Sequence, residues 1–269
     1  MTFGQAQVGA VGAAALSKTQ IGSNITLPAG GPWIIHGVWC QAIQDTAVAN
    51  EAVNGNLIVD SYSGDINPDP APGKYPVSGI NSASSANFAI AAVPLNIIPV
   101  RWEASGKAVI QLSFSNLSGN ATAPRAAAGI LFGDVIPEIR PMVFSDVASA
   151  TLTAAGETAI GTITLAEKAT RIVGLMGTMR KDGAITVDEG MIGYFRMDSA
   201  DIKFTPGQYP FDMAFSAADG TLAGHLSTPR SNFIPVDIPV EGGAIINLYG
   251  ILDQAITAGV DCSVFIAYE

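Results

Sequence analysis

One short element occurs twice in this chain. Pro72-Gly73-Lys74-Tyr75-Pro76 recurs 134 residues later as Pro206-Gly207-Gln208-Tyr209-Pro210. Gly106–Leu112 resembles Gly242–Leu248 at an offset of 136 residues. Colinear matches whose offsets drift by only a few residues are typical of a repeated unit with small loop insertions. The repeat therefore predicts two folding units of about equal length.

Further matches extend this register. They pair Ile97–Val100 with Phe233–Val236 at an offset of 136, and Ile25–Leu27 with Ile163–Leu165 at an offset of 138. We also align Ile34-Ile35 with Ile172-Val173 (offset 138), and Val53, Leu57 and Ile58 with Val187, Met191 and Ile192 (offset 134). The predicted segments are an N-terminal arm (1–17), a first unit (18–135), a linker (136–149) and a second unit (150–269).

Strand signals are frequent in both units. Ala108–Phe114, Ala244–Tyr249 and Cys262–Tyr268 are short runs rich in apolar, β-branched or aromatic residues. Gly, Pro, Asn and Asp punctuate the chain about every ten residues, which favours a sandwich or barrel over βαβ units. We therefore predict an all-β chain of two tandem β-sandwiches. Each unit has room for the eight strands of a jelly roll, and neither shows the Cys…Trp…Cys pattern of immunoglobulin domains.

The segment Gly4–Leu16 is the only candidate helix. Its apolar residues are mostly Ala, and its three glycines disfavour an isolated helix. Three interpretations stay open: an arm that orders against a neighbour or a membrane, a short helix, or a disordered end.

The repeated Pro-Gly-x-Tyr-Pro element has two interpretations. It could be a binding loop presented twice, or a rigid corner in which Gly allows a positive φ and Tyr packs on the sandwich edge. We expect the corner, which assigns structural roles to Pro72, Gly73, Tyr75, Pro76, Pro206, Gly207, Tyr209 and Pro210.

Signatures of catalysis are missing from the sequence. It contains no Gly-x-Ser-x-Gly elbow, no His-x-x-x-His or Cys-x-x-Cys spacing, and no glycine-rich nucleotide loop. His36 and His225 are far apart, and a structural role is expected for each. We therefore expect no catalytic residue and no cofactor.

Acidic residues offer one weak metal site. Asp60, Asp65 and Asp69 fall in a loop rich in Gly, Pro and Asn, where oxygen ligands could hold Ca²⁺. The same residue types are common in turns, and the spacing matches no EF-hand. The two cysteines, Cys40 and Cys262, are expected to be buried free thiols, because two in a chain this long make no disulfide framework.

Charge limits the partners. Only 13% of residues are charged, against roughly 25% in ordinary soluble domains, and the net charge is −10. No basic cluster exists that could neutralise a nucleic-acid backbone, so direct nucleic-acid binding is not expected. The low charged fraction fits either a large, well-packed monomer or a surface covered by neighbouring copies.

Tandem sandwiches, a short N-terminal arm, a connector with Pro137 and Pro141, and the lack of a catalytic centre together resemble one family. It is the double jelly-roll major capsid proteins of tailless icosahedral viruses, several of which enclose a membrane. The resemblance implies a structural protein of the virion shell that forms homotrimers and contacts neighbouring capsomers. It also implies contacts with minor capsid proteins or an internal membrane through the arm.

Two other classes stay open. One is a surface lattice, filament or adhesin subunit, which would be extracellular. The other is a carbohydrate-binding module, which would present aromatic side chains in a cleft. The tryptophans are Trp33, Trp39 and Trp102, of which the first two lie in apolar strand context and are expected to be buried.

Overall fold

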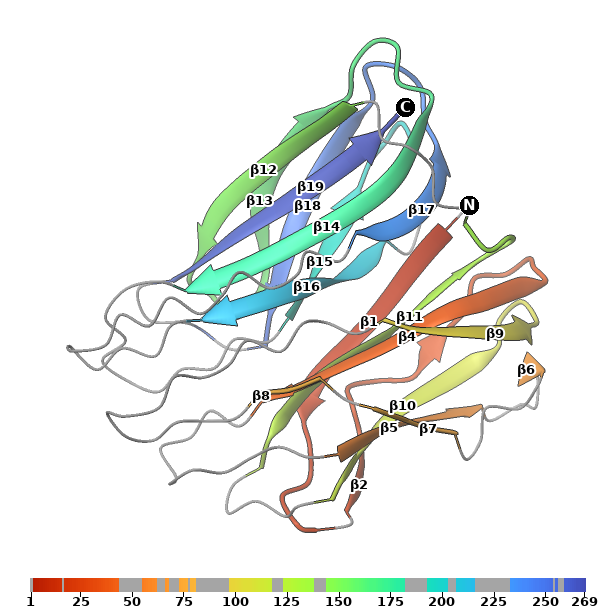
Figure 1. Cartoon of the computed structure of the whole chain (residues 1–269), viewed down its shortest axis with the longest axis vertical. Helices are drawn as coiled ribbons and strands as arrows, with labels where there is room; N and C mark the ends of the chain where they lie inside the picture. Colours follow the sequence, from red (N-terminus) through yellow and green to blue (C-terminus); the bar gives the residue numbers. More distant parts are fainter. Residues whose placement is uncertain are drawn as a thin grey trace.

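The computed structural model of the chain describes residues 2–15, 17–43, 55–61, 66–67, 73–76, 78–80, 97–117, 123–137, 144–181, 193–202, 207–215, 233–253, 255 and 259–269. All regular secondary structure in these segments is β-strand, and no helix among them is long and apolar enough to cross a membrane. The strands form two sandwiches, one above the other in Figure 1. The predicted all-β class and tandem sandwiches are confirmed.

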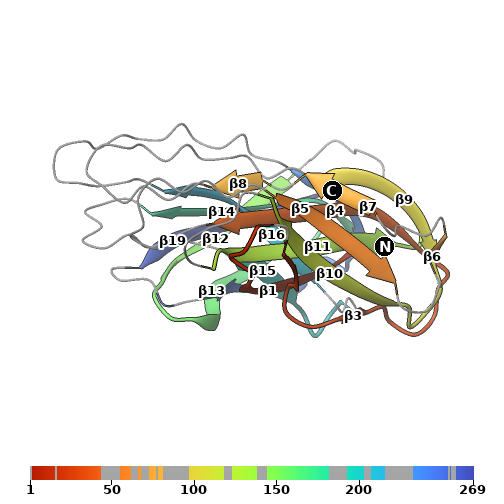
Figure 2. The ribbon, with the colours of Figure 1, turned by 90° about the horizontal axis from the view of Figure 1, so that it is seen from below.

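The first sandwich consists of two sheets. One has the order β1-β11-β4-β9-β6, with β8 also paired to β4, and the other has the order β2-β10-β5-β7, with β3 also paired to β10. Figure 2 views the chain from below, with this sandwich toward the reader. Its strands are β1 (Thr2–Ala10), β2 (Lys18–Gln20), β3 (Ile25–Thr26), β4 (Trp33–Ile43), β5 (Gly55–Ser61), β6 (Ile66–Asn67), β7 (Gly73–Pro76), β8 (Ser78–Ile80), β9 (Ile98–Ala104), β10 (Val109–Asn116) and β11 (Arg125–Gly133).

The second sandwich repeats this order. Its strands run β12-β19-β14-β16-β15-β18-β13, with β17 also paired to β14, so β16 joins the two layers. Taking β2 with β3 and β7 with β8 as single strands, each sandwich places its strands 1-8-3-6 in one layer and 2-7-4-5 in the other. The strands are β12 (Phe144–Leu152), β13 (Gly156–Thr164), β14 (Arg171–Lys181), β15 (Gly193–Asp198), β16 (Gln208–Phe215), β17 (Ile234–Pro239), β18 (Ile245–Leu252) and β19 (Val260–Tyr268).

The strand registers also agree. Two residues are equivalent where they occupy the same place in the two sets of ladders. β4 carries one extra residue, His36, between Ile35 and Gly37, and β14 carries Val173 between Ile172 and Gly174. A β-bulge of this kind bends a strand and fixes its register.

These ladders correct part of the sequence alignment. The bulge makes Ile35 equivalent to Ile172, an offset of 137 where the sequence match gave 138. Leu57 pairs with Tyr75, and Phe195 pairs with Tyr209, so Leu57 is equivalent to Phe195 and not to Met191. Sequence matching failed here because one apolar strand residue resembles another, whereas ladder pairing distinguishes them.

The N-terminal segment forms neither a helix nor a separate arm at residues 2–10. Thr2–Ala10 is β1, paired with β11 along its whole length. Gln5 donates a hydrogen bond from its side chain to the carbonyl of Thr26, and Gln7 accepts one from the backbone N–H of Ser23. This segment is therefore a strand of the first sandwich, which stabilises glycine-rich sequence that could not hold a helix.

The joint between the sandwiches is short. Val135 and Ile136 are exposed, and β12 begins at Phe144, so residues 144–149 of the predicted linker belong to a strand. The exact domain boundaries stay a prediction.

The core fills the space between the layers of each sandwich. Alternate residues of β10 and β18 are buried, which is the pattern of a strand with one face on the core. β11 is different, because eight of its nine residues are buried. Both of its faces are covered, since its outer side meets β16 of the second sandwich.

Candidate functional site

Contacts between the two sandwiches form the candidate functional site. β1 and β11 of the first sandwich lie against β16 of the second (Figure 1). Gly4 forms a parallel bridge to Gly207. A Cβ atom at position 4 would lie 2.0 Å from the carbonyl oxygen of Gln208, so the two backbones approach as closely as glycine alone permits.

Polar contacts fix the register of this approach. The backbone N–H of Ala6 donates to Oε1 of Gln208 at 2.9 Å, and the Tyr209 hydroxyl donates to the carbonyl of Thr2 at 3.3 Å. Nε2 of Gln41 donates to the carbonyl of Phe211 at 2.8 Å. Burial raises the pKa of Tyr209, so its hydroxyl stays protonated and can donate.

An ion pair closes one end of the contact. The guanidinium of Arg125, at the start of β11, pairs with the carboxylate of Asp253, just after β18. Their side chains are only 13% and 8% exposed. A pair this buried contributes geometric specificity, because leaving either charge alone would be costly.

The repeated element thus has an observed position. Gly73, Tyr75 and Pro76 lie in β7, and Tyr209 and Pro210 lie in β16, while Pro72 and Pro206 are outside the described residues. Gly207 forms the backbone bridge to Gly4 of the first sandwich. The second copy of the element therefore lies in the contact between the sandwiches, and its role as a corner stays a prediction.

Among the described residues, those on the equivalent surfaces are more exposed. Ala6 pairs with Gly129 and is 1% exposed, whereas its equivalent Val147 pairs with Phe265 and is 51% exposed. The other partner surface shows the same asymmetry. Tyr209 is fully buried, but its equivalent Tyr75 is only partly buried, with its ring 5.7 Å from that of Trp102.

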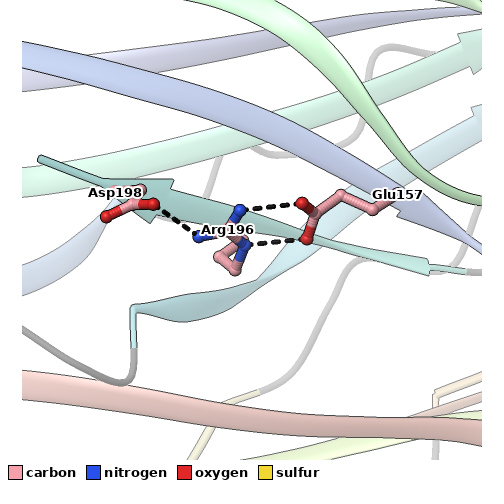
Figure 3. A network of polar contacts seen from close by, with 3 residues as sticks. All are labelled: Glu157, Arg196 and Asp198. Atoms are coloured by element: carbon pink, nitrogen blue, oxygen red, sulfur yellow. Dashed lines mark hydrogen bonds and ion pairs between the residues drawn. The ribbon is translucent and has the colours of Figure 1, made fainter.

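A charged network lies on the outer face of the second sandwich (Figure 3). Arg196 on β15 donates from Nη2 and Nε to the two carboxylate oxygens of Glu157, both at 2.8 Å, and from Nη1 to Asp198 at 3.1 Å. Its guanidinium carbon lies 4.3 Å from the centre of the Tyr249 ring. Hydrogen bonding to Arg196 lowers the pKa of Glu157. Because the guanidinium is already engaged on several sides, the network serves to join β13, β15 and β18.

The first sandwich carries a simpler pair at equivalent positions. Lys18 is equivalent to Glu157 and Asp60 to Asp198, and the Lys18 ammonium lies 2.5 Å from the Asp60 carboxylate. Asp60 was a calcium candidate with Asp65 and Asp69, which lie outside the described residues. Within the described segments, no three His, Cys, Asp or Glu side chains are grouped closely enough to hold a metal ion. Sequence reasoning missed Arg196, because Glu157 and Tyr249 come from other strands.

The remaining candidate residues are structural. Cys40 and Cys262 are free and buried, as predicted, and burial raises the pKa of both thiols. Burial lowers the pKa of His36, in the β4 bulge, to about 4. Trp39 is buried as expected and so is Trp102, while Trp33 is partly exposed beside Phe3 and Phe132. His225 is outside the described residues.

Comparisons with known proteins give distant similarities. No protein-family model matches the chain, and no curated protein is similar to it in sequence. One solved structure, "Crystal Structure of the STIV MCP", is 10% identical, covering 100% of this chain and 96% of that one, with a TM-score of 0.24. Another, "The Triple Jelly Roll Fold and Turret Assembly in an Archaeal Virus", is 12% identical over 97% of this chain, with a TM-score of 0.24. This chain spans 58% of the second protein's length.

Proposed function

We propose that this chain is the major coat protein of a virion shell and assembles with copies of itself. One observation carries the proposal. Each sandwich has a β1-type surface (β1 or β12) and a β16-type surface (β16, or β7 with β8). Among the described residues, the contact within the chain uses β1 and β16, whereas Val147 of β12 is 51% exposed and Tyr75 of β7 is partly exposed. A chain with one unused surface of each type can repeat its internal contact with identical chains.

Such a contact joins two different surfaces, so it is head-to-tail. Head-to-tail contacts close into rings when the rotation per chain permits and otherwise continue as open filaments. A homotrimer would alternate the two sandwich types around a ring of six, which gives the pseudo-hexagonal block that tiles a shell. Minor capsid proteins and neighbouring capsomers would contact the outside of this block.

Composition supports the same assignment. A charged fraction of 13% leaves much of the surface to small polar and apolar groups, which suits a protein covered by neighbours. The net charge of −10 disfavours contact with an anionic genome. Because Thr2–Ala10 is held in a sheet, the proposal assigns these residues no separate role in reaching a membrane.

A surface lattice or filament subunit is the second candidate. It would use the same β1-type and β16-type surfaces, but the rotation from one chain to the next would not close a ring. Light scattering and negative-stain imaging of the purified protein distinguish the candidates. A species of three times 27.7 kDa and compact hexagonal particles are expected for the coat protein, whereas rods or strings would favour the filament. A single-chain mass at high concentration would overturn both.

A further inference from the structure

The equivalent surfaces can be compared residue by residue. On the outer face of the first sandwich, Ala6 pairs with Gly129, which pairs with Trp39. On the second sandwich the equivalent row is Val147, Phe265 and Met176. On the first sandwich, a β16-type segment of the same chain packs over this row. The second sandwich has an equivalent row at the same place in its sheet.

Exposure shows which row lacks its partner. Ala6 is 1% exposed and Trp39 is fully buried, because the second sandwich covers them. Val147 is 51% exposed, and Phe265 and Met176 are partly exposed. An uncovered apolar row of this kind, continuous in position with an established contact, marks an interaction surface.

The segment that would cover this row is also present on the chain. β7 and β8 pair with β5 and β4 as β16 pairs with β15 and β14. Gly73 occupies the position of Gly207, which bridges Gly4, and Lys74 occupies the position of Gln208. Tyr75, at the position of Tyr209, is the partly exposed member of that pair.

Charge favours this pairing between chains. Lys74 stands where the internal contact has the neutral Gln208. The outer face of the second sandwich carries an exposed Asp261, where the first has Arg125. A cationic segment would therefore meet a surface that is more acidic than its internal counterpart.

One difference sets the spacing. Ser145 is equivalent to Gly4, so the second sandwich has a side chain where the internal contact has none. The backbones cannot approach as closely as Gly4 and Gly207 do. A contact between chains on this face would therefore be wider than the contact within the chain.

We infer that Gly73–Pro76 of one chain docks on the outer face of β12 and β19 of a second copy, over Val147, as Gly207–Phe211 docks within the chain over Ala6. The inference rests on the proposed self-association and names its surfaces. Lys74 lies in the first sandwich and Val147 in the second, and their strands β7 and β12 are far apart in Figure 1. A short link between residues 74 and 147 must therefore join two chains.

Cross-linking tests the contact directly. Full-length Lys74→Cys and Val147→Cys variants are prepared separately and mixed, then treated with a short bis-maleimide linker. The native Cys40 and Cys262 thiols are buried and should not compete. Linked pairs are expected only in the mixture, and the double variant should give covalent species of two and three chains.

A charge substitution provides the matched test. Val147→Arg should reduce the assembled fraction in light scattering at least tenfold. Ile245→Arg should leave it unchanged, because Ile245 is 47% exposed on the opposite layer of the same sandwich. Circular dichroism checks that both variants fold.

The outcomes separate the two claims. If the wild-type protein assembles but the Lys74→Cys and Val147→Cys variants do not link, the copies meet elsewhere; the inference fails and the proposed function stands. If the wild-type protein remains a single chain at every concentration, the proposed function fails and the inference with it.

Discussion

Gly4 and Gly207 are 203 positions apart in the sequence and form a backbone bridge between the two sandwiches. The Cβ of any other residue at position 4 would lie 2.0 Å from the carbonyl oxygen of Gln208. No flexible side chain can move aside to relieve that clash, because the obstructing atom belongs to the backbone.

Replacing this glycine should therefore weaken the joint. We expect Gly4→Ala to lower the free energy of unfolding by about 1–3 kcal/mol, as overpacking typically does. Gly9→Ala is the control on the same strand, since its Cβ would meet its closest atom, the backbone N of Gly22, at 3.3 Å. Urea unfolding of the two variants measures the difference, and equal stabilities would contradict the close-approach role of Gly4.

Removing one charge of the Arg125–Asp253 pair should also destabilise the chain. Because both side chains are largely buried, Arg125→Met should cost about 3 kcal/mol, much of which Asp253→Leu in the same chain should restore. Lys18→Met is the matched control: its pair with Asp60 is 48% and 25% exposed, and its loss should cost under about 1 kcal/mol. Chemical denaturation gives all of these values. Similar losses for Arg125→Met and Lys18→Met would show that the buried pair has no special role.

His36 should make stability depend on pH. Its pKa falls from 6.5 to about 4 on burial, so the unfolded chain binds a proton there more readily than the folded chain. The contribution is present above pH 6.5 and is lost as the pH falls toward 4, by at most about 3 kcal/mol. His36→Val, which introduces the residue of the equivalent bulge position, should flatten this part of the melting-temperature profile. An unchanged slope between pH 6.5 and 4 would assign the dependence to other groups.

The two thiols should be unreactive in the folded protein. Cys40 is fully buried in β4 and Cys262 in β19, and burial disfavours the thiolate that reacts with disulfide reagents. We expect no rapid modification by a thiol-specific dye in buffer and modification of both cysteines in urea. Rapid labelling of the folded chain would contradict the described burial.

Local patterns in the sequence were sufficient for the class of fold. Short apolar runs separated by turn residues predicted strands, because alternate residues of a strand such as β10 must face a core. The paired Pro-Gly-x-Tyr-Pro elements gave the offset of 134 that the β7 and β16 ladders reproduce. The alignment of β5 with β15 failed, because apolar residues such as Leu57 have several equally good partners until a ladder selects one.

The candidate site was beyond such patterns. Sequence reasoning singled out Gly207 and Tyr209 as parts of a structural corner, which stays a prediction, and it did not connect either residue with Gly4. Their roles depend on contacts between residues about 200 positions apart, which leave no local signal.

By itself, the sequence determined that the chain forms strands and contains two similar units, since periodicity and repetition are properties of neighbouring residues. Only the tertiary structure decided that Thr2–Ala10 is the first strand of the first sandwich, and which copy of each surface is covered. Ala6 and Val147 show the physical reason. Equivalent residues in similar strands differ in exposure because one of them has the other sandwich packed beside its strand.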